Sequence, residues 1–265
     1  MLEKRITVSA LLGLNLLACA SSPAGVRAYS PAGYPGSVWG SLTRGDDDTE
    51  GTGVQGWARQ GVRWVRFPGA LDLDTYGVYN WRVRTRNKTY YNTHGPSLIA
   101  AIEKGPFSVG AEFAWLRYPD QPLNAKNYAL FAGWYASQDV SKWTGSPSAG
   151  GYEPLALPLS LWGKMSYDLH GEEGSGSMGW VKQGVDWFSL GGWRFNTYGA
   201  YNWRLRSKNR TYYDVYGPSV GAVFRRRYFD VGAECYWQRF PQLYRTARTF
   251  NISLGWYYSW DLKGR

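Results

Sequence analysis

The residues best suited to chemistry form a short basic and aromatic motif that occurs twice in the chain. Residues 86–91 read RNKTYY and residues 208–213 read KNRTYY. Aromatic faces stack on sugar rings, and Arg or Lys pairs with phosphate or carboxylate groups. The motif therefore predicts contact with an acidic polysaccharide or lipopolysaccharide, and an interfacial belt beside lipid headgroups is the alternative. The candidate ligand-binding residues are Tyr90, Tyr91, Tyr212, Tyr213, Arg86, Lys88, Lys208 and Arg210.

A second set of charged residues occupies alternating positions of expected strands. On the inner face of a barrel, such residues either pair and fill the lumen or line a basic channel for an anionic solute. The formal net charge of +10 is compatible with both interpretations. The expected lumen-facing charges are Arg82, Arg84, Glu112, Arg204, Arg206 and Glu234.

The sequence gives little support to an enzymatic function. The two histidines are not duplicated, because His94 corresponds to Tyr216 and His170 to an acidic loop position near Asp47. No metal-ligand spacing, phosphate-binding loop or nucleophile motif is present. The sequence therefore predicts a protein that is not an enzyme and has no metal site or cofactor.

Both copies of the aromatic motif belong to an internal duplication that covers nearly the whole chain. Residues 77–97 (GVYNWRVRTRNKTYYNTHGPS) return as residues 199–219 (GAYNWRLRSKNRTYYDVYGPS), at an offset of 122. Upstream, an offset of 123 relates Trp39, Trp57 and Trp64 to Trp162, Trp180 and Trp187. A functional interpretation of one repeat must therefore account for the other.

The polarity of the chain alternates with period two over runs of about ten residues, which indicates strands rather than helices. Between Trp193 and Arg206, for example, apolar side chains share one face and Arg and Asn side chains share the other. Segments 54–67 and 178–190 also fit a helical stripe, and we favour strands there because glycines weaken a helix. Six strands in each repeat predict an all-β, antiparallel fold of twelve strands.

The expected connections alternate between long polar loops and short turns, which places the loops at one end. The Gly/Ser/Pro-rich junction between the repeats, on the turn side, is the exception. Apolar faces with aromatic residues near their ends suit a bilayer, with polar residues directed into a lumen. These features favour a twelve-stranded outer-membrane β-barrel. Two tandem soluble β-sandwich or barrel domains are the alternative, because their cores show the same alternation. The expected loops are residues 45–53, 86–95, 117–127, 169–177, 208–217 and 239–248.

The closing segment, residues 237–260, reads WQRFPQLYRTARTFNISLGWYYSW and contains the pattern Ser253-x-Gly255-x-x-Tyr258-x-Trp260. Its pattern of aromatic residues and arginines resembles the closing strands in the C-terminal barrel region of phage-adsorption and exopolysaccharide-export outer-membrane proteins. In those proteins helical repeats precede the barrel, and this sequence does not show them. The resemblance implies an envelope protein close to polysaccharide traffic.

The N-terminal residues predict export and a lipid anchor. Lys4 and Arg5 precede an apolar stretch, 6–17, that is too short to span a membrane. Leu16-Leu17-Ala18-Cys19, at the end of this stretch, form a lipoprotein box, and ordinary cleavage after Ala20 is the alternative. The expected organisation is a lipoprotein signal peptide at 1–19, a flexible tether at 20–36, a first β-repeat at 37–137, a Gly/Ser/Pro-rich junction at 138–157 and a second β-repeat at 158–265.

These features predict a non-enzymatic outer-membrane lipoprotein of a Gram-negative envelope. Its aromatic and basic loops would contact envelope or secreted polysaccharide, in export or surface retention. The expected partners are outer-membrane lipid, polysaccharide or lipopolysaccharide, and envelope secretion proteins, with no nucleic acid. A lipid-tethered soluble module that binds a glycan or a protein is one alternative, and a small-solute porin is another.

We expect the mature chain to begin with a diacylglyceryl-modified Cys19. The only other cysteine, Cys235, corresponds to Phe113 in the first repeat and therefore suits apolar packing rather than thiol chemistry. Mass spectrometry of the mature N-terminus should show the acylated cysteine, and the variant Cys19→Ser should lack the added mass. A mature chain that begins at unmodified Ser21 would contradict this expectation.

Overall fold

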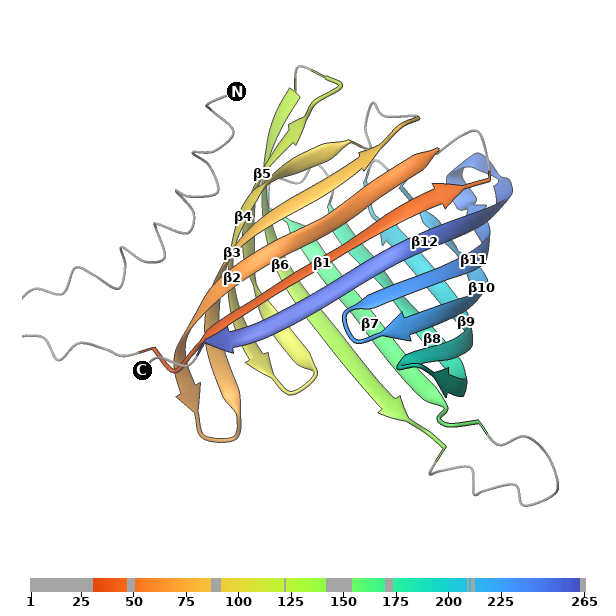
Figure 1. Ribbon diagram of the computed structural model, residues 1–265. Helices are drawn as coiled ribbons and strands as arrows, with labels where there is room; N and C mark the ends of the chain where they lie inside the picture. The colour runs from red at the N-terminus through yellow and green to blue at the C-terminus, as the bar shows by residue number, and fades with distance from the viewer. Residues whose placement is uncertain are drawn as a thin grey trace, which may run out of the picture.

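The computed structural model describes residues 31–46, 51–86, 92–121, 123–141, 154–169, 174–208, 210 and 213–262. Over these residues the chain forms a closed antiparallel barrel of twelve strands (Figure 1). Among them, no helix has the length and apolar character needed to cross a membrane. The strands are β1 (Tyr34–Gly45), β2 (Thr52–Phe67), β3 (Leu71–Arg84), β4 (Thr93–Lys104), β5 (Phe107–Tyr118), β6 (Leu123–Asp139), β7 (Pro158–Asp168), β8 (Ser175–Leu190), β9 (Trp193–Arg206), β10 (Val215–Arg226), β11 (Phe229–Phe240) and β12 (Arg245–Leu262).

The two repeats are joined into a single sheet by two seams. At one seam β6 pairs with β7 from Ala129↔Asp168 to Asp139↔Pro158. At the other, β1 pairs with β12 along its whole length, which closes the ring. Closure leaves no edge strand with unpaired backbone groups. The predicted twelve-stranded barrel is therefore confirmed, and two separate soluble domains are excluded.

The interior of the barrel is polar and its exterior is apolar. The largest fully buried side chains are all polar: Asn196, Asp74, Asp214, Ser37, Ser97 and Ser219. Large apolar side chains on the outer face are exposed, among them Leu42, Leu98, Ile102, Leu130, Val181, Val220, Val231, Ile252 and Leu254. A soluble barrel would bury the second set around a core. The observed arrangement is that of a barrel whose outer surface faces lipid.

Tryptophan side chains cover paired glycines on the outer face of the barrel. Trp256 of β12 lies over Gly40, and Trp134 of β6 lies over Gly163 in the equivalent place. An added Cβ at either glycine would overlap the indole ring, so these positions favour glycine. Trp81 and Trp203 cover Gly56 and Gly179, the glycines directly opposite on the next strand, in the same way. Each repeat thus places two indole rings side by side on the outer face.

A β-bulge explains why segments 54–67 and 178–190 also resembled helices. The register shifts between Arg63 and Val65 in β2, and between Asp186 and Phe188 in β8. Each bulge holds a tryptophan whose indole Nε1 donates to a threonine on the next strand, from Trp64 to Thr75 Oγ1 at 2.9 Å and from Trp187 to Thr197 Oγ1 at 2.8 Å. The extra residue breaks the period-two pattern, and both segments are strands.

The short turns, the start of β1 and the end of β12 lie at one end of the barrel, and the loop-side ends of the strand pairs β1–β2, β3–β4 and β5–β6 lie at the other (Figure 1). The strands are longer than we predicted at 117–127 and 239–248, which were expected as long loops. β5 and β6 are separated only by residues 119–122, and β11 and β12 by a single 3₁₀ turn (Pro241–Leu243) and Tyr244. At the rim of a barrel, one face of each strand is directed to the lumen and the other to lipid headgroups, so both faces carry polar residues. In the sequence such a segment therefore resembles a loop.

We expect a charge on the outer face to destabilise the barrel, and the same charge on the inner face to be tolerated. Leu254 faces outward between Leu42 and Val231, whereas Ser253 faces inward beside Gly232. Leu254→Arg should lower the free energy of unfolding in phospholipid vesicles by about 2–4 kcal/mol, and Ser253→Arg should cost much less. Denaturant unfolding followed by tryptophan fluorescence measures both values. Equal losses in the two variants would refute the assignment of the faces.

Candidate functional site in the barrel lumen

The structure places the six expected lumen charges on the inner face. Arg82 and Arg84 follow the buried Asp74 and Val78 of β3 at even intervals, and therefore share their inward side. Arg204 and Arg206 share the inward side of β9 with the buried Asn196 in the same way. Glu112 of β5 and Glu234 of β11 lie on inward faces nearer the middle of the barrel.

The duplication arranges these charges in opposed pairs. β3 and β9 are six strands apart in either direction around the ring, so they lie on opposite walls. Equivalent residues of the two repeats therefore face one another across the lumen. Arg82 and Arg84 approach one mouth from one wall, and Arg204 and Arg206 approach it from the other.

The two equivalent glutamates have different partners. Glu112 Oε2 lies 2.8 Å from Lys164 Nζ of β7, and the same ammonium lies 4.9 Å from the centroid of the Phe131 ring. Glu234 Oε2 instead accepts hydrogen bonds from the hydroxyls of Tyr198 at 2.7 Å and Tyr236 at 2.6 Å. These carboxylates are thus held inside the lumen by direct contacts, as the interpretation of paired lumen charges predicts.

A cation stacks on a tyrosine at equivalent places in both repeats. Arg59 of β2 lies 4.9 Å from the centroid of Tyr76, and its Nε donates to Ser37 Oγ at 2.7 Å. Lys182 of β8, the counterpart of Arg59, lies 3.2 Å from the centroid of Tyr198. Cation–π contacts of this kind strengthen when they are shielded from water. They hold the two tyrosine rings in place on the inner face.

At the turn side, the first repeat contains a network of ion pairs around a buried carboxylate. The Asp74 side chain is fully buried and accepts hydrogen bonds from Arg63 Nε and Nη2, both at 3.1 Å. Arg63 also pairs with Asp72 at 3.0 Å and with Asp261 of β12 at 3.1 Å. Arg66 completes the network with two contacts to Asp72 at 2.8 and 3.0 Å.

At the loop side, the lumen mouth contains a tyrosine held between two arginines. The Tyr213 ring centroid lies 4.1 Å from the Arg206 guanidinium carbon and 4.7 Å from that of Arg204. Arg204 Nε also donates to the backbone carbonyl of Tyr213 at 3.1 Å. Tyr213 is half-buried in this position. It therefore lies at the lumen mouth, with its ring beside the two arginines of β9.

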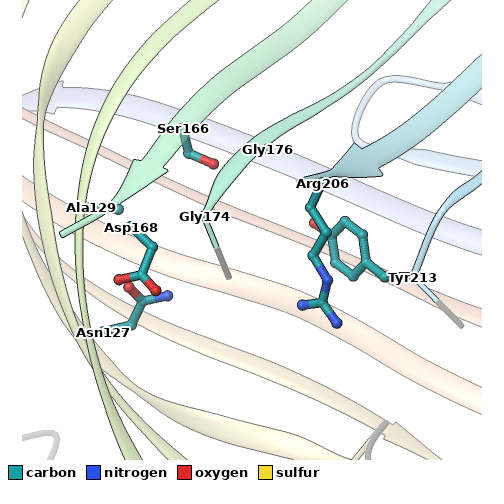
Figure 2. A pocket seen from close by; sticks show the side chains of 8 residues that line it. All are labelled: Asn127, Ala129, Ser166, Asp168, Gly174, Gly176, Arg206 and Tyr213. Carbon is teal, nitrogen blue, oxygen red and sulfur yellow. The ribbon is translucent and has the colours of Figure 1, made fainter. Parts of the chain in front are cut away.

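Figure 2 shows the small cavity beside this tyrosine, which is lined by three strands of the second repeat and by β6 of the first. Asn127 of β6 and Asp168 of β7 lie next to one another and face Arg206 and Tyr213 across the cavity. Its volume is about 30 Å³, room for roughly two water molecules. The mouth thus offers a carboxylate, an amide, guanidinium groups and an aromatic face around a hydrated space.

A polar residue that we did not predict anchors the loop at the mouth. The Asp214 side chain is fully buried, its Oδ1 accepts from the backbone N–H of Arg206 at 2.8 Å, and its Oδ2 pairs with Arg210 Nε at 2.8 Å. In the first repeat Asn92 Oδ1 accepts from the backbone N–H of Arg84 at 2.7 Å. The sequence did contain a signal for this role. The two repeats carry Asn and Asp at this position, and both side chains accept hydrogen bonds from backbone N–H groups.

The structure describes only some of the other expected site residues. Arg86 and Lys208 are exposed at the ends of β3 and β9, and the partly exposed Arg210 pairs with Asp214. Tyr90, Tyr91, Tyr212, Lys88 and Cys19 lie outside the described residues. Contact with polysaccharide through this motif, and the lipid anchor, therefore stay predictions. In the described part of the chain, no cluster of three His, Cys, Asp or Glu side chains could hold a metal ion.

No protein-family model and no curated protein matches the sequence. Several solved structures are similar to the barrel as a whole. They include an outer membrane channel from Pseudomonas putida F1 (TM-score 0.41, 6% identity, 91% of this chain and 100% of that chain covered), the KdgM porin (TM-score 0.33, 10% identity, 83% and 98% covered) and the beta domain of the Bordetella autotransporter BrkA (TM-score 0.35, 10% identity, 84% and 98% covered). The similarity is limited to the barrel form.

We expect Arg63 to be needed for the stability of the barrel, because it compensates the buried charge of Asp74. Arg63→Met should cost about 3–5 kcal/mol of unfolding free energy, since it leaves that carboxylate unpaired inside the barrel. The double variant with Asp74→Asn should recover much of this loss, because the second repeat already has Asn196 at this position. Denaturant unfolding of both variants tests the expectation. A double variant no more stable than Arg63→Met alone would contradict it.

Proposed function

We propose that this protein is an outer-membrane barrel that admits a small anionic solute into its lumen, as a porin does. The apolar exterior and the polar interior support its residence in a bilayer. All strand edges are paired in the closed ring, as the absence of water in a membrane requires. The short turns and both ends of the barrel sequence would then lie on the periplasmic side.

The observation that carries the anionic preference is the placement of Arg82, Arg84, Arg204 and Arg206. They approach the loop-side mouth from opposite walls, so an entering solute meets guanidinium groups on both sides. Charges of one sign in a low-dielectric cleft raise the local concentration of the opposite ion. Guanidinium groups also bind carboxylate and phosphate in a fixed two-point geometry.

Acidic oligosaccharides belong to the class of solutes that this mouth suits. Their carboxylates would meet the arginines, and their sugar rings offer a face to Tyr213. This possibility links the lumen to the predicted contact of the loops with polysaccharide. A lipid anchor at Cys19 would hold the same barrel in the outer membrane without altering the route through the lumen.

We expect the protein to conduct ions in planar bilayers with a preference for anions. Changing Arg82, Arg84, Arg204 and Arg206 together to Gln should move the reversal potential in a KCl gradient toward the cation side. The matched control changes four exposed arginines on the outer face to Gln: Arg44, Arg117, Arg239 and Arg248. It removes the same charge and should leave the selectivity unchanged. A folded barrel that never conducts, or an equal shift in both variants, would refute the proposal.

A further inference from the structure

A second basic cluster lies at the opposite, turn-side mouth of the barrel. It surrounds a cavity of about 240 Å³, eight times the volume beside Tyr213. The lining residues come from β8, β9, β10 and the two turns that follow β8 and β10: Asp186, Ser189, Gly192, Arg194, Arg225 and Arg227. A cavity of this size has room for an oxyanion together with some of its water.

The arginines around this cavity outnumber the carboxylates beside them. Arg194 of β9 and Arg225 of β10 are directly opposite in the strand register, and like charges in such a pair destabilise a sheet. Asp186 Oδ2 lies 3.2 Å from Arg194 Nη1, and Asp230 of β11 is directly opposite Arg225 in the strand register. Among the described residues, the Arg225 and Arg227 guanidinium groups donate no hydrogen bond to a protein acceptor. Their N–H groups are available to a ligand in the cavity.

The equivalent place in the first repeat shows that the fold does not require these arginines. Arg194, Arg225 and Arg227 correspond to Asp72, Glu103 and Gly105, at the offset of 122. Asp186 corresponds to Arg63, so the sign of the charges is reversed between the two walls. In the first repeat the reversed charges close into the network of Arg63, Arg66 and three aspartates. In the second repeat they leave an open basic cavity.

We propose that Arg194, Arg225 and Arg227 bind a phosphoryl group at the turn-side mouth. Three guanidinium groups against the carboxylates of Asp186 and Asp230 leave an excess of positive charge and several N–H donors, which suit the three acceptor oxygens of a phosphoryl group. The Ser189 hydroxyl lines the same cavity and can donate a further hydrogen bond. The site goes beyond solute admission at the loop-side mouth, because binding here does not depend on conduction through the lumen.

Calorimetric titration of the full chain in an uncharged maltoside detergent, with inorganic pyrophosphate as the probe, tests the site. Wild-type protein should bind the probe, and the triple variant Arg194→Gln, Arg225→Gln, Arg227→Gln should bind it at least about tenfold more weakly, since hydrogen bonds between charged groups are lost. The matched control is Arg226→Gln, which removes an arginine beside Arg225 that points outward over Trp193. This control should bind like the wild type.

The single variant Arg227→Gln is the control in case the triple variant does not fold. Arg227 lies in an exposed turn, so this change should not disturb the barrel. It should keep the heat-modifiable gel mobility of a folded barrel and still weaken binding. Added phosphatidylglycerol that competes with pyrophosphate would support a lipid headgroup as the natural source, and no competition would support a soluble phosphate ester. The proposal is overturned if the wild type does not bind pyrophosphate, or if the folded triple variant binds it as tightly as the Arg226→Gln control. Either result leaves the conductance experiment unaffected.

Discussion

Closure of the backbone hydrogen-bond ring is the constraint on which the rest of this structure depends. A strand in a bilayer has no water to satisfy its N–H and C=O groups, so every strand needs two neighbours. The pairing of β1 with β12, from Tyr34↔Leu262 to Gly45↔Asn251, supplies the last of these contacts. Once the ring is closed, each side chain must point either to lipid or to the lumen. The inside-out distribution of polar and apolar residues follows from that choice.

Closure of the ring also determines how the two repeats are placed around the lumen. Twelve strands formed by two repeats of six place each residue opposite its own counterpart, so a change in one repeat alters one wall of the lumen. Where the copies agree, as at Arg84 and Arg206, both walls present the same charge to a solute. Where they differ, as at Arg63 and Asp186, one wall is closed by ion pairs and the other stays open. The same backbone thereby supports two different mouths.

The lumen charges combine structural and functional roles. Asp74 is fully buried and needs Arg63, because an unpaired carboxylate inside the barrel is costly. Lys164 with Glu112, and the tyrosines with Glu234, satisfy the carboxylates near the middle. The basic groups at the two mouths lie where a solute would first meet them. Specific contacts at the mouths thus rest on a middle section in which the carboxylates of Glu112 and Glu234 have direct partners.

The sequence by itself determined the strand periodicity, the number of strands, the duplication and the two faces of each strand. These features are local, because side chains alternate along a strand whatever its partners are. It also predicted inward positions for residues such as Arg82 and Glu112. It could not place the bulges at Trp64 and Trp187 or the true ends of β5 and β11, because register and rim position depend on the neighbouring strands.

Only the tertiary structure decided which residues meet. The inward position of Tyr213 depends on Arg204 and Arg206 reaching it from a neighbouring strand. The anchoring role of Asp214 and the open cavity around Arg225 depend in the same way on contacts across strands. Composition and spacing fix which face a side chain occupies, but its partners belong to other strands. Ring closure brings those partners together, and no short segment of the sequence encodes it.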